Sequence, residues 1–157
     1  MIKWTALFAL LLAAPLAAQT NIDLGGITTN PNAPIEVAAD SLSVDQETGT
    51  AIFEGNVVIG QGDLRIGASR AQVVYDGATG NIANFEASGG VTFATATEAA
   101  EAQNANYDLI NGKLVLTGDV ILTQGPSALS ADRMTIDVKT GNAQMEGRVR
   151  TVFQQGN

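Results

Sequence analysis

The feature that most constrains the fold of this chain is a short pattern of aspartate and glycine that occurs four times. In each occurrence a glycine follows an aspartate by four residues, and a Gly-x-Val tripeptide begins ten residues after the aspartate, or thirteen in the second occurrence. The pairs are Asp45 and Gly49, Asp76 and Gly80, Asp108 and Gly112, and Asp137 and Gly141. Successive aspartates are 31, 32 and 29 residues apart. A period of this size indicates four structural repeats, each burying its apolar face against its neighbours.

Within the repeats, apolar residues alternate with other residues over short stretches, which is typical of β-strands with one buried face. Residues 35–39, 42–44 and 64–68 show this alternation in the first repeat. Gly55 and Asn56 lie between two apolar stretches and predict a two-residue type II′ hairpin, because glycine adopts positive φ without steric cost. With four strands per repeat we expect about 15 short antiparallel strands, near the common length of 5–6 residues. Residues 98–102 could instead form one helical turn.

The N-terminal residues have the composition of an export signal. Residues 1–18 combine Lys3, an apolar run and a small-residue exit before Gln19, and we interpret them as a cleaved signal peptide. The alternative is an uncleaved membrane anchor, but the apolar run is shorter than the roughly 20 residues that cross a bilayer. Residues 19–34 are expected to form an extended leader, residues 35–154 the β-repeat domain, and residues 155–157 a tail.

The composition narrows the classes of function. The 157 residues include no histidine and no cysteine, which removes Ser-His-Asp and Cys-His catalysis and the common zinc ligand sets. The repeated aspartates lie beside turns, where aspartate bonds to the backbone, so we assign no catalytic residue. No calcium-binding loop pattern occurs, and we expect no metal and no cofactor. The sequence therefore predicts a protein that is not an enzyme.

The charge of the chain also excludes a class of partner. Without Lys3 there are seven basic and sixteen acidic residues, a net charge of −9, which gives no electrostatic footprint for nucleic acid. We interpret the basic residues as solvated charges on strand faces and assign them no role. They are Arg65, Arg70, Lys113, Arg133, Lys139, Arg148 and Arg150.

The first and last repeats contain the most distinctive sequence motifs. The first has Ala-Asp-Ser-Leu-Ser-Val-Asp at residues 39–45 and Thr-Gly-Thr-Ala-Ile-Phe-Glu-Gly-Asn-Val-Val-Ile-Gly-Gln-Gly at residues 48–62. The last has Ala-Asp-Arg-Met-Thr-Ile-Asp at residues 131–137 and Thr-Gly-Asn-Ala-Gln-Met-Glu-Gly at residues 140–147. In these stretches the chain closely resembles the periplasmic lipopolysaccharide-transport family LptA, also called OstA-like. The second repeat lacks the Glu-Gly-Asn motif, and the third lacks the Ala-Asp pair at its start.

The resemblance implies an all-β fold, a half-open β-jelly-roll shaped like a V or a taco. It implies a periplasmic protein of a Gram-negative envelope that holds the acyl chains of lipopolysaccharide between the two leaves of this sheet. Members of the family pair head to tail through their edge strands. They bridge an inner-membrane export complex with an LptC-like component and an outer-membrane translocon with an LptD-like component.

Strand alternation combined with this resemblance predicts which residues line a lipid groove. These are Phe53, Val57, Ile59, Leu64, Ile66, Val73, Phe85, Val91, Phe93, Leu114, Leu116, Val120, Leu122, Met134, Ile136 and Met145. The expected edge-strand residues for assembly are Ile35, Val37, Val149, Thr151 and Phe153. The alternative is an exported structural or adhesive β-repeat protein, in which the same apolar residues fill a closed core without a lipid ligand.

Overall fold

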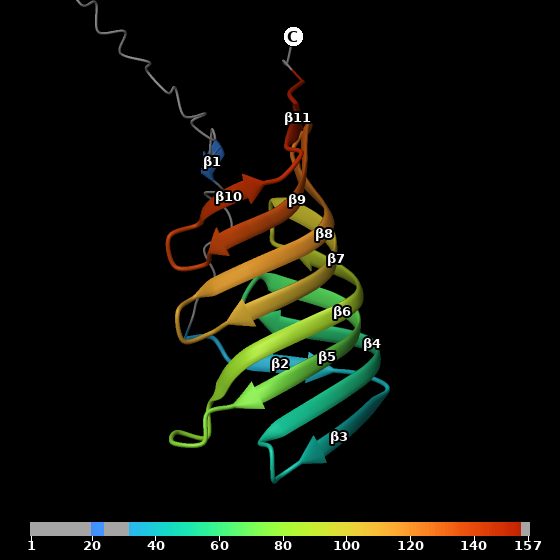
Figure 1. The fold of residues 1–157 in the computed structure, drawn as a ribbon, viewed down its shortest axis with the longest axis vertical. Coiled ribbons are helices and arrows are strands. Elements are labelled where there is room, and N and C mark those ends of the chain that lie inside the picture. Colours follow the sequence, from blue (N-terminus) through green and yellow to red (C-terminus); the bar gives the residue numbers. More distant parts are fainter. Residues whose placement is uncertain (1–19, 24–31, 155–157) are drawn as a thin grey trace, which may run out of the picture.

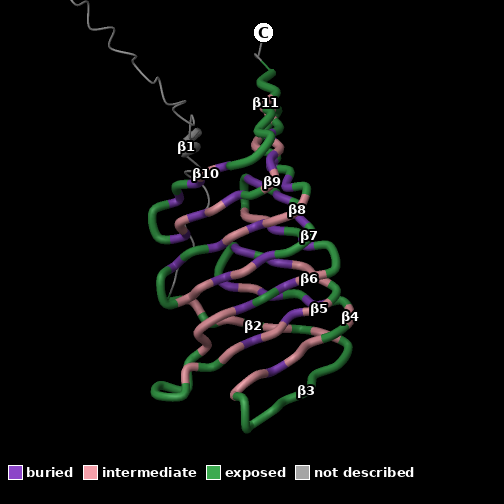
Figure 2. The backbone as a smooth tube through the Cα atoms, in the orientation of Figure 1, coloured by how far each residue is buried: buried purple, intermediate pink, exposed green. Residues whose placement is uncertain are grey.

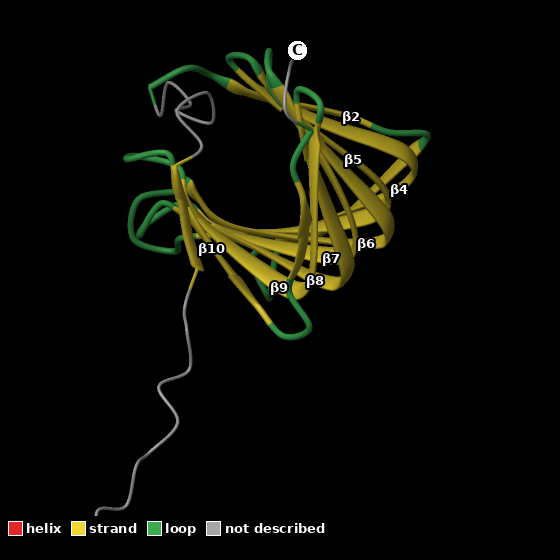
Figure 3. Ribbon diagram, turned by 90° about the horizontal axis from the view of Figure 1, so that it is seen from above, coloured by secondary structure: helices red, strands yellow, loops and turns green. Residues whose placement is uncertain are grey.

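A single antiparallel β-sheet curves around a common interior (Figures 1 and 3). The computed structural model describes residues 20–23 and 32–154, which contain eleven strands and no helix. The strands are β1 (Thr20–Asp23), β2 (Ile35–Ala38), β3 (Ser41–Asp45), β4 (Thr50–Gln61), β5 (Leu64–Tyr75), β6 (Ile82–Ala94), β7 (Glu98–Asp108), β8 (Lys113–Gln124), β9 (Ser127–Asp137), β10 (Asn142–Glu146) and β11 (Arg150–Val152). The expected all-β class is confirmed, and residues 98–102 belong to strand β7 and form no helical turn.

The order of strands follows the sequence except at the N-terminus. Neighbouring strands run β1, β10, β9, β8, β7, β6, β5, β4 and β2, while β3 pairs with β4 and β11 pairs with β9. Strand β1, which lies within the expected leader, therefore joins the end of the sheet formed by the last repeat. The expected signal peptide and the tail at residues 155–157 lie outside the described residues.

The expected number of short strands is wrong, because pairs of them are joined into long ones. Strands β4 to β9 are 11–13 residues long. The predicted hairpin at Gly55 and Asn56 is also wrong: β4 continues through both residues, and only its register with β5 shifts between Glu54 and Val57. Both residues have positive φ, 80° and 47°, so they form a bulge that bends the strand without reversing it.

Similar shifts lie along one line across the sheet and divide it into two leaves. We call leaf 1 the part of the sheet that lies on the same side of these shifts as β3 and β10. Leaf 2 is the part that lies on the same side as β2 and β11. Strand β4 pairs with β3 through residues 50–54 and with β2 through residues 58–61. Strand β9 likewise pairs with β10 through residues 133–136 and with β11 through residues 128–130. Each long strand therefore belongs to both leaves.

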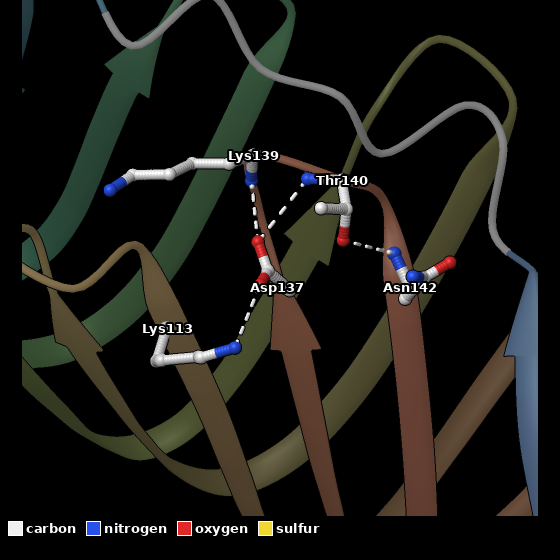
Figure 4. Close-up of polar contacts among 5 residues, drawn as sticks. All are labelled: Lys113, Asp137, Lys139, Thr140 and Asn142. Carbon is white, nitrogen blue, oxygen red and sulfur yellow. Dashed lines mark hydrogen bonds and ion pairs between the residues drawn. The ribbon is translucent and has the colours of Figure 1, made fainter.

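The repeated aspartates stabilise the turns at the tips of leaf 1. Asp137 Oδ1 accepts hydrogen bonds from the backbone amides of Lys139 and Thr140 at 3.0 and 3.2 Å, and its Oδ2 lies 2.7 Å from Lys113 Nζ (Figure 4). Asp45, Asp76 and Asp108 accept backbone hydrogen bonds within their own turns in the same way. The interpretation of these aspartates as turn residues is confirmed.

Candidate functional site

The inner face of the curved sheet carries the predicted lining residues. All of them except Phe53 are buried, with at most 4% of their surface exposed, and Phe53 is half-buried against the same cluster. Buried and more exposed residues alternate along the long strands (Figure 2). All of these residues except Phe53 thus fall on the buried positions of this alternation, and their role as the lining of a lipid groove stays a prediction.

These side chains pack into one continuous hydrophobic cluster that includes residues of both leaves. Phe93 of leaf 2 and Leu116 of leaf 1 are each only 1% exposed. Because a residue that lined an open trough would be reached by solvent, the two leaves are closed on each other in this conformation.

The buried face also holds residues that were not predicted from the sequence, and most of them are alanines. The inward positions of β7 are occupied by Ala100, Ala102 and Ala105, all buried, before the strand ends at Tyr107 and Asp108. Other buried residues that were missed are Ala51, Ala71, Ala87, Leu129, Ala131, Val138 and Ala143. Their place in the period-two pattern was a usable signal, but alanine carries little weight in a search for apolar runs.

Two polar side chains are buried at the free end of leaf 2. Gln61, the last residue of β4, and Glu98, the first residue of β7, are each 5% exposed. Glu98 Oε2 accepts hydrogen bonds from the hydroxyls of Thr95 and Thr97 at 2.8 and 2.5 Å. Gln61 Nε2 donates to the carbonyl of Ala33 at 3.3 Å. Both residues hold inward positions at strand ends, which is the sequence signal that could have found this polar rim.

The bends between the leaves require glycine. Gly55 has a φ of 80°, and a Cβ atom built there would lie 2.5 Å from Asp40 Oδ2. Asp40 fixes this bend from the neighbouring segment, because its amide donates to the Gly55 carbonyl at 2.9 Å and its carboxylate accepts from Asn56 Nδ2 at 2.9 Å. The pairs Ser69 and Gly89, Gln103 and Gly118, and Asp132 and Gly147 make equivalent close approaches.

The last bend carries the shortest ion pair of the described residues. Arg148 Nη2 lies 2.6 Å from Asp132 Oδ1, and its Nε also donates to this carboxylate. The hydrogen bond from the Arg148 side chain lowers the pKa of Asp132, and the same contact raises the pKa of Arg148. At the leaf 1 tips, the Lys113 side chain lowers the pKa of Asp137, and backbone amides lower the pKa of Asp45. These groups are exposed or only partly buried, and their printed contacts lie within the turns and bends and between neighbouring strands.

Two different edges end the sheet. At the N-terminal end, β2 and β3 pair only with β4 among the described strands, and the inward residues of β3, Leu42 and Val44, are 55% and 60% exposed. At the C-terminal end β11 pairs only with β9, whereas β10 is covered by β1. Figure 2 shows β3 and the end of the chain at β11 as exposed.

The predicted edge residues lie on these two edges. Ile35 and Val37 belong to β2, and Thr151 belongs to β11. Val149 and Phe153 flank β11, and Phe153 is 72% exposed. The prediction did not include β3, which forms the other half of the N-terminal edge.

Among the residues that the structure describes, no cluster of acidic side chains has the arrangement of a metal site. No helix within the same residues is long and apolar enough to cross a membrane.

The family of the chain follows from comparison with known proteins. Residues 36–142 match the family described as LptA/(LptD N-terminal domain) LPS transport protein. The chain belongs to this family. It is 29% identical to the lipopolysaccharide export system protein LptA of Escherichia coli strain K12 over 136 residues, which cover 83% of this chain and 73% of that protein. It is 33% identical to the protein of the same name from Haemophilus influenzae over 133 residues, which cover 78% and 77% of the two chains.

A solved structure supports the same fold. The crystal structure of LptH, described as the LptA homologous periplasmic component of the conserved lipopolysaccharide transport device from Pseudomonas aeruginosa, matches with a TM-score of 0.73. The match covers 81% of this chain and 99% of LptH at 18% sequence identity. The expected jelly-roll architecture is confirmed by this likeness.

Proposed function

We propose that this protein is a periplasmic bridge component that binds lipopolysaccharide and passes it from an inner-membrane export complex to an outer-membrane translocon. The acyl chains are shielded between leaf 1 and leaf 2, against the predicted lining residues. The observation that carries this proposal is the continuous apolar inner face of the sheet, in a chain that belongs to a family of lipopolysaccharide transport proteins.

The energetics of burial favour such a guest. Each methylene removed from water contributes about 0.8 kcal/mol, so one acyl chain of about fourteen carbons contributes on the order of 10 kcal/mol before entropic losses. The inner face offers aliphatic and aromatic side chains along its whole length, from Val57 in the first repeat to Met145 in the last. The guest replaces contacts between the leaves with contacts to its own chains, which offsets the cost of opening.

Opening requires motion at the bends and at the rim. The long strands cross from one leaf to the other at Gly-containing bulges, where the ladder of hydrogen bonds is already interrupted. The hydrogen bond between Gln61 and Tyr107 joins the free ends of the leaves. We infer that the leaves rotate apart about the bends, and that the guest enters between the free ends.

Assembly through the edges completes the bridge. Unpaired strands accept further strands, so the N-terminal edge of one copy can extend the C-terminal edge of another. We infer that copies join head to tail in this way, with an LptC-like partner at the inner membrane and an LptD-like partner at the outer membrane. Cleavage after the predicted signal peptide would release the mature chain into the periplasm.

Site-specific photo-crosslinking tests the binding of lipid. A photoreactive amino acid replaces Phe93 or Leu116 on the inner face, or Gln72, which is half-buried beside an outer surface pocket. After irradiation with lipopolysaccharide, we expect adducts from the two inner positions and none from Gln72. Adducts from Gln72 alone, or none from any position, would favour the alternative function as a structural protein with a permanently filled core.

A further inference from the structure

The sheet repeats in steps of two strands. In each step a two-residue bend of the first strand lies opposite one residue of the next strand. Residues 55–56 of β4 lie opposite Ser69 of β5, residues 89–90 of β6 opposite Gln103 of β7, and residues 118–119 of β8 opposite Asp132 of β9. The register is therefore fixed by the same bulge at each step. A further step of the ladder must follow the same rule.

The last bend, at Gly147 and Arg148 between β10 and β11, has the geometry that starts another such step. At the opposite end of the sheet Asp40, between β2 and β3, holds the place that Asp132 holds between the two halves of β9. Continuing the ladder into a second copy places Gly147 and Arg148 opposite its Asp40. Glu146 then pairs with Ser41 of the second copy, and Val149 with Ala39.

This register continues into both leaves. In leaf 1, residues 145, 144, 143 and 142 meet Leu42, Ser43, Val44 and Asp45 of the second copy. Leu42 and Val44 are the inward residues that are left exposed at the N-terminal edge. They would cover the buried inner residues Met145 and Ala143 of β10. In leaf 2, residues 150 and 151 meet Ala38 and Val37 of the second copy.

Strand β1 already occupies the leaf 1 positions within a single chain. Thr20, Asn21, Ile22 and Asp23 pair with Met145, Gln144, Ala143 and Asn142. These are the four residues of β10 that the ladder assigns to residues 42–45 of a second copy, with a constant offset of 22 positions. The two segments also end alike, in Ile22-Asp23 and Val44-Asp45. Strand β1 thus has the register on β10 that β3 of a second copy would have, and its last two residues are similar to those of β3.

We propose that β1 is an internal substitute for β3 of a second copy, which occupies the leaf 1 half of the C-terminal edge until another copy displaces it. This inference rests on the proposed head-to-tail assembly. Strand β11 remains unpaired on its outer side among the described residues, so association starts between β11 and β2 of the next copy. Displacement of β1 by β3 then completes the joint. In the free protein β1 protects half of an edge that would otherwise invite unspecific pairing.

The competition can be measured with the chain from Gln19 onward, which is the start expected after removal of the predicted signal peptide. One variant lacks residues 20–23. A second carries Asn21→Cys and Gln144→Cys, which lie directly opposite each other and can form a disulfide that locks β1 onto β10. The chain has no other cysteine, so the same variant under reducing conditions is the matched control. Association constants come from sedimentation equilibrium, and circular dichroism checks that each variant is folded.

We expect the deletion to tighten association about tenfold. This is the effect of raising the fraction of molecules with a free β10 edge from about a tenth to nearly all. The oxidised lock should weaken association by at least about tenfold, and reduction should restore it. If all forms associate with the same constant, β1 does not compete and this inference is overturned while head-to-tail assembly stands. If no form associates, head-to-tail assembly fails, and the inference fails with it.

Discussion

The hydroxyl of Tyr107 donates a hydrogen bond to Oε1 of Gln61 at 3.3 Å, and this contact joins the free ends of the two leaves. Tyr107 lies at the end of β7 in leaf 1, and Gln61 ends β4 in leaf 2. The strands β4 and β7 are separated by β5 and β6 in the sheet, so the contact crosses the interior and does not follow the ladder. Both side chains are almost fully buried. The pair therefore acts as a polar clasp at the mouth through which a guest would enter.

Removing the clasp should make opening easier. We expect Tyr107→Phe to lower the free energy of unfolding by about 1 kcal/mol, because one buried hydrogen bond is lost and the ring is kept. If the same contact breaks when the leaves open, lipopolysaccharide uptake should become roughly fivefold faster. Stopped-flow fluorescence with a labelled lipopolysaccharide measures the rate. Tyr75→Phe is the matched control, since Tyr75 is the other tyrosine and lies exposed at the end of β5. An equal rate for both variants would contradict the role of the clasp.

The bends should be sensitive to a single methyl group. Gly90 and Gly147 both have positive φ, near 80°, but a Cβ atom at Gly90 meets open space, whereas one at Gly147 lies 2.5 Å from Asp132 Oδ2. Gly90→Ala should cost roughly 1–2 kcal/mol from backbone strain alone. Gly147→Ala should cost roughly 1–3 kcal/mol more from crowding. Urea unfolding measures both, and equal costs would show that Asp132 does not pack tightly against the bend.

Acid should weaken the turns at the leaf 1 tips. Asp45, Asp108 and Asp137 have pKa values lowered from 3.8 by hydrogen bonds in the folded protein. A lowered folded pKa means that the ionised form stabilises the fold, so this stability is complete above the unfolded pKa and is lost as the pH falls through the folded pKa. Urea unfolding should show the loss below about pH 4, and less of it in Asp137→Asn. An unchanged acid profile in that variant would count against a role for the Asp137 charge.

The register of the joint between copies can be tested directly by disulfide formation. Arg150 of one copy and Ala38 of the next are expected to lie opposite each other in leaf 2. A mixture of Arg150→Cys and Ala38→Cys chains should therefore form a covalent dimer on oxidation. Replacing Ala38→Cys with Glu36→Cys shifts the cysteine by two residues along β2, and its dimer yield should be much lower. A higher yield with Glu36→Cys would show that the joint has slipped from the register of the repeats.

Local chemistry was enough to predict much of this fold. Aspartate and glycine at fixed spacing located the turns, because Asp45 and Asp137 accept bonds from the next amides whatever surrounds them. Alternation located the inner face, because neighbouring residues of a strand point to opposite sides. The Gly55-Asn56 bend was predicted as a hairpin because glycine followed by asparagine fits either a hairpin turn or a bulge. The contact with Asp40 and the pairing of β4 with β5 before and after the bend favour the bulge.

Other features depend on contacts that no local pattern encodes. Strand β1 forms against a segment more than a hundred residues away in the chain, and its four residues are too few to show a period. The clasp between Tyr107 and Gln61 joins residues 46 positions apart. Whether the leaves are open or closed is a matter of packing, and the apolar pattern is the same in both states.

If the leaves open to admit lipid, the distance between their tips must increase, and this distance is the most direct measure of the opening. Ile110, in the turn after β7, and Asp63, in the turn after β4, are both exposed and lie near the two ends of the clasp. Spin labels on Ile110→Cys and Asp63→Cys report this distance by double electron–electron resonance, without background from native cysteines. We predict a short distance in the free protein and a clear shift to longer distances when lipopolysaccharide is bound. An unchanged distance in a sample that retains lipopolysaccharide would show that the leaves do not open to admit lipid.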